Sequence, residues 1–527
     1  MRRAFLLAMA VVMAAGVGGL GGAARGAGAE GTGKVVKVDE GRKAKALELV
    51  KKAGMTDAAG KQRIRGDIGA VAGAIGAVAG AIGDEALLKS AVDDDPDQWG
   101  KVQIYTSAAH EQAARGDMVG AKKSVAAAVA LLALPEEKGG AGGSVAEFGD
   151  HQVVQLQNVA LAQGDVGNLT AAEATAARMP ASTMQALVYA GLGVAEMKAG
   201  NSAPAAGDFD RAEAVLAGLS AEDHSMAWAM LADDEAKTNP ERARKMLERM
   251  KDPMDQAARA AFIAGRFAQD GRVADARTFV AAAAALVNRA GGDPGAVSKR
   301  VGAESALAQA YGAIGDKKAG MEMLGKAAAG IAAEKNPSSL ELLDLAIAED
   351  RLGQTDDSDQ TLAKVIDALP SDEKERTHVL WLMSEMLAFR GDVWDAADFI
   401  DKARVAHLGE EDAVYACVTA ESLAKSDGED AKLEWIDQMK DQAGAVIQRE
   451  LYASAARGMV EAGENPKVRR FEAMAAAGDA EAMARLGAIF DAGLGVAKDM
   501  TAARSWYQKA AGAKDTEAAD WLKAHPE

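Results

Sequence analysis

The chain contains few of the residues that build disulfide domains or β-rich cores. Aromatic residues make up 4% of its 527 residues, and the single cysteine is Cys417. One cysteine excludes an internal disulfide. Alanine is abundant and β-branched residues are sparse, which favours α-helices. Cys417 lies within a helical pattern, so we expect it to be a small core residue and not a nucleophile.

Basic side chains are also in deficit. The chain has 60 lysines and arginines against 78 aspartates and glutamates, a formal net charge of −18. Such a chain repels the phosphate backbone, which excludes nucleic acid as a partner. The excess of acid keeps the protein soluble. It also permits basic partners or loosely held cations.

Recognisable catalytic motifs are missing. The sequence lacks a phosphate-loop lysine motif, a His-Glu-x-x-His pair and a Gly-x-Ser-x-Gly turn. Its six histidines occur singly, which argues against a metal cluster. Gly16, Gly18 and Gly21 match a dinucleotide-binding pattern, but no strand precedes them. We therefore predict no catalytic residue, no cofactor and no metal site. The acidic residues are too numerous for a catalytic pair to be chosen.

Residues 1–29 have the pattern of a secretory signal peptide. Arg2 and Arg3 precede an apolar run at 5–15, and small residues at 27–29 form a cleavage site before Glu30. A membrane anchor is the alternative, although the run is shorter than a bilayer span. The paired arginines also resemble a twin-arginine signal, so the export route stays open. Either route would deliver the protein to the periplasm or beyond.

An N-terminal helical region is predicted at residues 30–102, and it contains an unusual segment at 68–83. The segment reads IGAVAGAIGAVAGAIG, a unit of seven residues written twice and begun again. Isoleucine and valine form one helical stripe and glycine a second, which permits very close helix contact. We interpret the segment as a tightly packed helix. A membrane-associated helix and a loose or β-prone segment are the alternatives.

A helix–turn–helix unit recurs from residue 103 to residue 465, at intervals of about 30–50 residues that are typical of a helical solenoid. Turn glycines are expected to end each first helix, because glycine takes the left-handed conformation without strain. The turns are predicted at Gly116, Gly164, Gly200, Gly271, Gly315, Gly353, Gly391 and Gly428, with Asn239-Pro240 in the remaining gap. Residues 135–150 are glycine-rich and predict a flexible loop.

The unit at 378–406 is among the best formed. Leu380, Met383 and Leu387 lie on one helical stripe and are predicted core residues. Arg390-Gly391-Asp392 resembles an adhesion tripeptide. We interpret it as a turn followed by a helix cap.

Three of the units share an order of residues. One contains Ile263-Ala264, Phe267, Gly271, Ala276, Val280 and Ala283, a second Leu307-Ala308, Tyr311, Gly315, Gly320, Leu324 and Ala327, and a third Leu192-Gly193, Gly200, Ala205, Phe209 and Ala212. This order resembles the tetratricopeptide repeat, although Glu196 stands where an aromatic residue is usual. The resemblance covers residues 103–465. It implies an all-α fold, a right-handed α-solenoid of antiparallel helix pairs.

Residues 466–527 carry a different pattern. Ala482–Phe490 is followed by Gly493-Leu494-Gly495, by Asp499 and by Ala502–Ala511. This order is similar to a Sel-one-like repeat. The resemblance implies that Gly487 lets two helices approach, that Gly493 and Gly495 make the loop between them, that Asp499 caps the second helix and that Trp506 packs back on the first. We expect this region to cap the array.

These features predict an exported, non-enzymatic scaffold that binds protein or peptide partners in the cell envelope. Two alternatives stay open: an enzyme acting on cell-wall glycan, and a protein held at a membrane through residues 68–83. The sequence does not identify the partner. We expect the binding residues among the variable polar positions on the inner face of the array.

Overall fold

The structure is a computed structural model that describes most of the chain after residue 37. The described residues are 38, 40–53, 68–95, 98–132, 151–219, 225–289, 297–334, 336–372, 433–438, 440–460, 480–492 and 499–525, with short pieces at 375–376, 379–380, 382–383, 387, 416–417, 419–421, 423–424, 468, 471–472 and 475. The predicted signal peptide, the loop at 135–150 and residues Gly391, Gly493 and Gly495 lie outside them.

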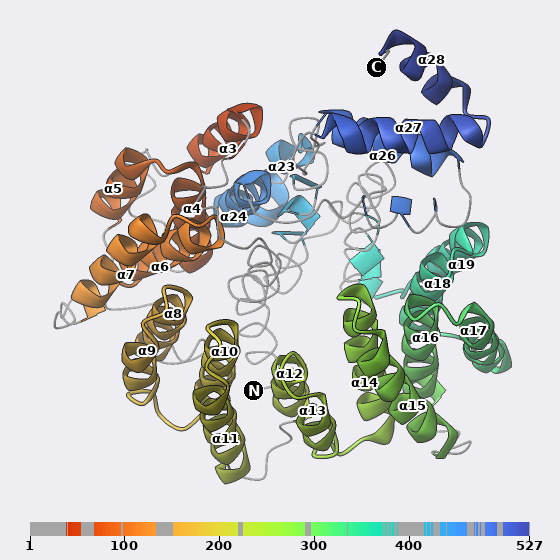
Figure 1. The fold of residues 1–527 in the computed structure, drawn as a ribbon, viewed down its shortest axis with the longest axis horizontal. Helices are drawn as coiled ribbons and strands as arrows, with labels where there is room; N and C mark the ends of the chain where they lie inside the picture. Colours follow the sequence, from red (N-terminus) through yellow and green to blue (C-terminus); the bar gives the residue numbers. More distant parts are fainter. Residues whose placement is uncertain are drawn as a thin grey trace. The chain divides into compact units, whose positions relative to one another are not determined.

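Within these ranges every regular element is an α-helix (Figure 1). Contacts divide the chain into unit 1, residues 1–168 with 380–527, and unit 2, residues 169–379. The helices of unit 1 are α3 (Glu40–Lys52), α4 (Ile68–Ile82), α5 (Glu85–Asp94), α6 (Gln98–Ala114), α7 (Met118–Leu132), α8 (His151–Asp165), α23 (Trp435–Gln438), α24 (Lys440–Val460), α26 (Ala480–Ala492), α27 (Met500–Gly512) and α28 (Thr516–Ala524). The predicted domain ranges stay predictions, because these units are defined by contacts and not by repeats.

Unit 2 consists of α9 and five consecutive helix pairs. Its helices are α9 (Leu169–Ala176), α10 (Thr183–Lys198), α11 (Ser202–Gly218), α12 (Ser225–Ala236), α13 (Pro240–Leu247), α14 (Pro253–Gln269), α15 (Val273–Arg289), α16 (Val297–Ala313), α17 (Lys317–Ala333), α18 (Ser339–Arg351) and α19 (Thr355–Asp367). Each first helix packs on the second helix of its own pair and on the first helix of the next pair. Figure 1 shows α14 beside α15 and α16 beside α17. The predicted all-α fold of stacked helix pairs is confirmed.

Short turns join the helices of a pair. Gly271 and Gly315 have φ angles of +74° and +83°, in the left-handed region that favours glycine. After Gly315, Asp316 caps α17 by accepting a hydrogen bond from the backbone N of Ala319. One predicted turn was misplaced. Helix α8 runs through Gly164 to Asp165, and the turn glycine is Gly167, with φ of +75°. The backbone N of Asn168 donates to the carbonyl oxygen of Gln163 at 2.9 Å, which closes the end of the helix.

Glycine makes the contact between α4 and α6 in unit 1. A Cβ atom at Gly76 would lie 2.8 Å from the Cα of Ile104, and one at Gly80 would lie 2.8 Å from the Cα of Ala108. The two backbones therefore touch, which a side chain at either glycine would prevent. Residues 71–81 of α4 are buried among the helices of unit 1. The interpretation of 68–83 as a tightly packed helix is confirmed.

Helix α24 packs on α3 and α4. Two arginine side chains donate hydrogen bonds to the carbonyl oxygens at its C-terminal end. Arg42 donates from Nε to the carbonyl oxygen of Met459 at 2.7 Å, and Arg115 donates to that of Val460. The last carbonyls of a helix have no partner inside it, so these side chains replace the missing donors. Arg115 belongs to one of the Arg-Gly-Asp tripeptides, and Gly116 and Asp117 form a turn there. No helix in the described ranges combines the length and apolarity needed to cross a bilayer.

Part of the unit at 378–406 is described. Leu380, Met383 and Leu387 are buried, as core residues are. Cys417 is partly buried, and desolvation by burial raises the pKa of its thiol. A raised thiol pKa disfavours the reactive thiolate, as we expect of a structural cysteine.

Candidate functional site

Helix α14 has a stripe of one exposed and three partly buried residues opposite its buried side. Asp255, Arg259, Phe262 and Arg266 follow one another at spacings of three and four residues, which places them on one helical face. The buried residues Ala257, Ala260, Ala261 and Ala264 face the core. Phe262 is therefore exposed on a helix whose opposite side packs in the core.

Neighbouring first helices continue this stripe. Arg259 donates from Nε to the Oδ1 of Asp233 on α12 at 2.9 Å. Arg351 on α18 donates from an Nη atom to the Oε1 of Gln309 on α16 at 2.5 Å. We call the resulting surface the first-helix face. It comprises Met226, Asp233, Arg259, Phe262, Arg266, Gln309, Leu340, Asp344 and Arg351, which lie on α12, α14, α16 and α18.

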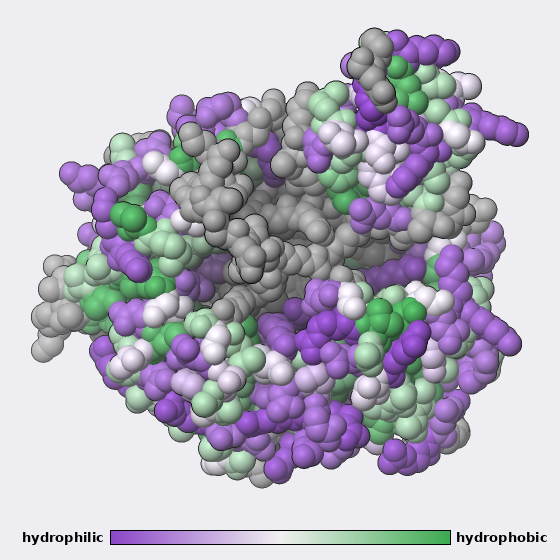
Figure 2. All heavy atoms as spheres, viewed as in Figure 1, coloured by the Kyte–Doolittle hydropathy of each residue, from purple (hydrophilic) through white to green (hydrophobic). Residues whose placement is uncertain are grey.

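Phe262 is the largest exposed apolar side chain on the first-helix face. It is 47% exposed, and the guanidinium of Arg259 lies 4.8 Å from the centre of its ring. Burial and the nearby charge of Arg266 lower the pKa of Arg259 to about 10, so the Arg259 guanidinium is still positive at neutral pH. Figure 2 shows a hydrophobic area in the region of α14, surrounded by hydrophilic residues. An exposed aromatic ring between two arginines has the composition of a protein-binding hot spot.

A second feature of unit 2 is a glutamate buried near the end of several first helices. The glutamates follow a large–small pair after two further residues, as in Leu192-Gly193 with Glu196, Leu231-Ala232 with Glu235, and Leu345-Ala346 with Glu349. All three are less than 10% exposed. In the pair α14–α15 the same position holds Phe267, which is also buried. The position is thus part of the core, and a carboxylate there requires a polar partner.

The partners of these glutamates differ. Glu235 lies 3.8 Å from the Nε of Arg242 on α13. The hydroxyl of Thr361 bonds to Glu349 and opposes the rise of its pKa. Glu196 accepts a hydrogen bond from the side-chain amide of Asn201 at 2.7 Å, but it also faces a second carboxylate.

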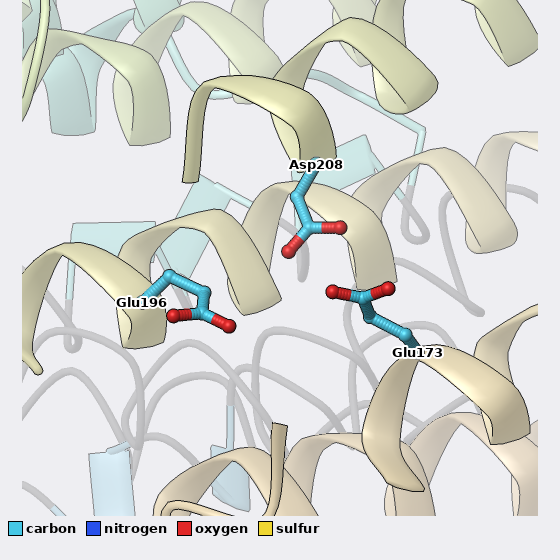
Figure 3. Close-up of side chains that lie close together, drawn as sticks. All are labelled: Glu173, Glu196 and Asp208. Carbon is cyan, nitrogen blue, oxygen red and sulfur yellow. The ribbon is translucent and has the colours of Figure 1, made fainter. Parts of the chain in front are cut away.

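That carboxylate belongs to an acidic cluster of Glu173, Glu196 and Asp208 from α9, α10 and α11 (Figure 3). One oxygen of each residue lies within 4.8 Å of an oxygen of the others. Arg211 donates to the Oδ1 of Asp208 at 2.7 Å and lies 2.9 Å from the Oε2 of Glu173. Its guanidinium is the one positive group contacting the cluster among the described residues.

Asp208 is the most unusual member of the acidic cluster. It lies seven residues after the N-cap of its helix, where α13 has Met246, α17 has Met323 and α19 has Thr361. Its side chain is 0% exposed, and its Oδ2 has no hydrogen-bond partner among the described residues. Desolvation, and then the charge of Glu173, raise the pKa of Asp208 to about 6. A charge therefore occupies a position where most other pairs bury an apolar or hydroxyl side chain.

The structure places the sequence-predicted residues in turns and helix contacts. Gly271 and Gly315 occupy the turns described above. A Cβ at Gly487 would lie 2.8 Å from the ring of Tyr507 on α27. Asp499 caps α27 by accepting hydrogen bonds from the backbone N atoms of Thr501 and Ala502. Trp506 packs on a core cluster that includes Leu486 and Ile489 of α26, whereas Gly391, Gly493 and Gly495 lie outside the described residues.

Neither the first-helix face nor the acidic cluster was selected from the sequence. A signal for the cluster existed, since Glu196 interrupts the expected aromatic position of its repeat. The position of Asp208 in its repeat, compared with the same position in the other repeats, would have shown a second charge at a core position. The approach of Glu173 had no sequence signal, because it depends on how α9 packs on α10.

Comparisons with known proteins add no family. No family model matches the chain, and no curated protein sequence matches it. Among solved structures, the chain is similar to that of Naa15/Naa10 bound to HypK-THB, with a TM-score of 0.20 and 15% sequence identity over 91% of this chain and 80% of that one. A TM-score this low carries no argument about fold or function. The tetratricopeptide-like and Sel-one-like assignments stay predictions from the sequence.

Proposed function

We propose that this protein is an exported, non-enzymatic scaffold that binds protein or peptide partners through the first-helix face of unit 2. The observation that carries the proposal is the stripe of Arg259, Phe262 and Arg266 on α14. Stacked helix pairs supply a long surface built from successive first helices, and such surfaces suit extended ligands. The tetratricopeptide-like pattern in the sequence agrees with this role.

The chemistry of the stripe favours a particular kind of ligand. Phe262 offers an apolar surface, and Leu340 and Met226 are each 45% exposed on the same face. Arg266 offers donors that pair with a carboxylate, and so does the Nη atom of Arg259 that does not bond Asp233. The expected ligand is a peptide segment with a hydrophobic side chain close to an acidic one. This expectation is specific, because the chain as a whole is acidic and repels acidic partners elsewhere.

A selection from random peptides tests the proposal directly. Residues 30–527 would be used to select binders from a random peptide library, and the affinities of the selected peptides measured on Phe262→Ala. We expect affinity to fall at least about tenfold, as for loss of a hot-spot aromatic side chain. Met321→Ala is the matched control, since Met321 is 41% exposed on α17, a second helix. Equal affinities for wild type and Phe262→Ala would contradict the proposal.

Export is a separate part of the proposal and rests on residues 1–29. Expression of the full chain in a bacterial host, followed by intact mass measurement of the periplasmic protein, should give a chain that begins at Glu30. Full-length protein retained in the cytoplasm would contradict it. A zymogram against cell-wall glycan with the same purified material tests the non-enzymatic role, for which no cleared zone is expected.

A further inference from the structure

We propose that the acidic cluster of Glu173, Glu196 and Asp208 binds one hard divalent cation, for which calcium is the probe. Carboxylate oxygens are the ligands that calcium and magnesium prefer. The cluster supplies one oxygen from each of three helices, all within 4.8 Å of one another (Figure 3). This inference goes beyond the proposed scaffold function and does not depend on it.

Charge balance is the first argument. The three carboxylates carry three negative charges when ionised, and Arg211 returns one positive charge. A divalent cation would neutralise the remainder. Helix α12 differs in this respect, because there the equivalent Glu235 lies next to Arg242 from its own pair. In the pair α10–α11 the partner is Asn201, which donates to Glu196 but brings no charge.

The second argument is independent of the clustering. Asp208 is fully buried, and its Oδ1 is paired with Arg211, while its Oδ2 bonds to no group in the part of the chain that the structure describes. Figure 3 shows the carboxyl group of Asp208 directed toward the two glutamates. An unpaired buried carboxylate oxygen is costly, and a bound cation would remove that cost. Three other second helices place methionine or threonine at this position, so the fold itself does not require a carboxylate there.

Arg211 pairs with two members of the acidic cluster. Its side chain is 49% exposed, and its guanidinium lies 5.8 Å from the ring of Tyr189. It pairs with Glu173 and Asp208 through one nitrogen each time, which leaves their second oxygens to a cation. Its charge opposes that of a metal ion, so removal of the arginine should strengthen cation binding.

Cation binding would join α9, α10 and α11 at the beginning of unit 2. The expected consequence is a stability that depends on the cation concentration, because a ligand that binds the folded state stabilises it. The experiment measures thermal unfolding of residues 30–527 after dialysis against a chelator, with added calcium chloride, magnesium chloride or potassium chloride of matched ionic strength. We expect the Tm to rise by at least about 2 °C with a divalent salt in tenfold excess over its Kd.

Two variants are expected to change the cation-dependent shift in Tm in opposite directions. Asp208→Asn should abolish the shift in Tm, and Arg211→Gln should produce it at a lower cation concentration. Glu241→Gln is the control, since Glu241 is an exposed acidic residue on α13 outside the acidic cluster. Titration calorimetry of the wild type should show one calcium or magnesium ion per chain, which tests the proposal even where a variant does not fold. Absence of binding in the wild type, or an unchanged shift in Asp208→Asn, would overturn it.

Discussion

Two helix contacts in this protein use opposite means to bring alanine-rich helices together. Between α4 and α6 in unit 1, the contact forms because Gly76 and Gly80 have no side chains, and the backbones touch. Between α10 and α11 in unit 2, Gly193 accommodates the ring of Phe209, but Glu196 and Asp208 are buried in the same pair. The first contact is made by glycines against the backbone of Ile104 and Ala108. The second contains carboxylates that need partners.

The difference indicates which changes should affect the stability of each contact. A glycine contact depends on shape alone, so it should be indifferent to pH and intolerant of a single added carbon. A contact with buried carboxylates depends less on exact shape. Its stability responds to protons and cations. The α4–α6 contact is thus fixed by shape, whereas the α10–α11 pair contains carboxylates whose ionisation depends on solution conditions.

The largest effect is expected at α4. Gly76→Ala would place a methyl group against the backbone of Ile104, and the free energy of unfolding should fall by about 3 kcal/mol or more. Gly325→Ala is the control, because Gly325 lies inside α17 with no atom within 4 Å of an added Cβ. It should raise stability by about 0.5–1 kcal/mol through the better helix propensity of alanine. Urea denaturation compares the two, and equal effects would contradict the close backbone contact.

An intermediate effect is expected at Glu235, which represents the carboxylate type of contact. Burial raises the pKa of Glu235 from 4.5 to about 7, with Asp210, Glu213 and Asp234 adding to the rise and Arg242 opposing it. The folded state therefore holds this proton more tightly than the unfolded chain does. The stabilising contribution of Glu235 to the free energy of unfolding is fully present below pH 4.5 and is lost as the pH rises toward 7.

Glu235→Gln should therefore flatten the fall in stability between pH 4.5 and 7, by on the order of 2 kcal/mol. Thermal unfolding across that range measures the effect. In Glu241→Gln the fall should not flatten, because the pKa of exposed Glu241 is lowered by its hydrogen bond to Arg244. An unchanged pH profile in Glu235→Gln would show that this carboxylate finds a compensating partner when ionised.

The smallest effect is expected at α26–α27, where a glycine contact lies beside an exposed helix cap. Gly487 admits the ring of Tyr507, and the exposed carboxylate of Asp499 caps α27 with two hydrogen bonds of 2.9 Å. Asp499→Ala should cost about 1 kcal/mol, as loss of an N-cap does. Asp520→Ala is the control, since Asp520 is exposed inside α28 and pairs only with Lys523 among the described residues. Equal stabilities of Asp499→Ala and Asp520→Ala in calorimetry would show that the cap does not stabilise this pair.

Local pattern predicted much of the fold. The spacing of apolar residues and the turn glycines located most helix pairs, and the glycine stripe at 68–83 predicted a close helix contact. The turn at Gly164 was wrong by three residues, because a glycine can lie inside a helix when a better turn follows. The first-helix face could be anticipated only as a set of variable polar positions. Its members are defined by contacts between separate pairs, such as that of Arg259 with Asp233.

The sequence by itself determined the helical fold, the repeat and the residues that end each helix, because these depend on neighbours three or four positions apart. It also contained the exceptions, Glu196 and Asp208, as charges at positions that the repeat otherwise fills with apolar groups. Only the tertiary structure decided that Glu173 lies beside these two residues and that Arg211 pairs with Glu173 and Asp208. It also decided that Phe262 stays exposed next to Arg259. Those relations depend on how separate helices pack, and contacts between distant segments leave no fixed spacing in a chain.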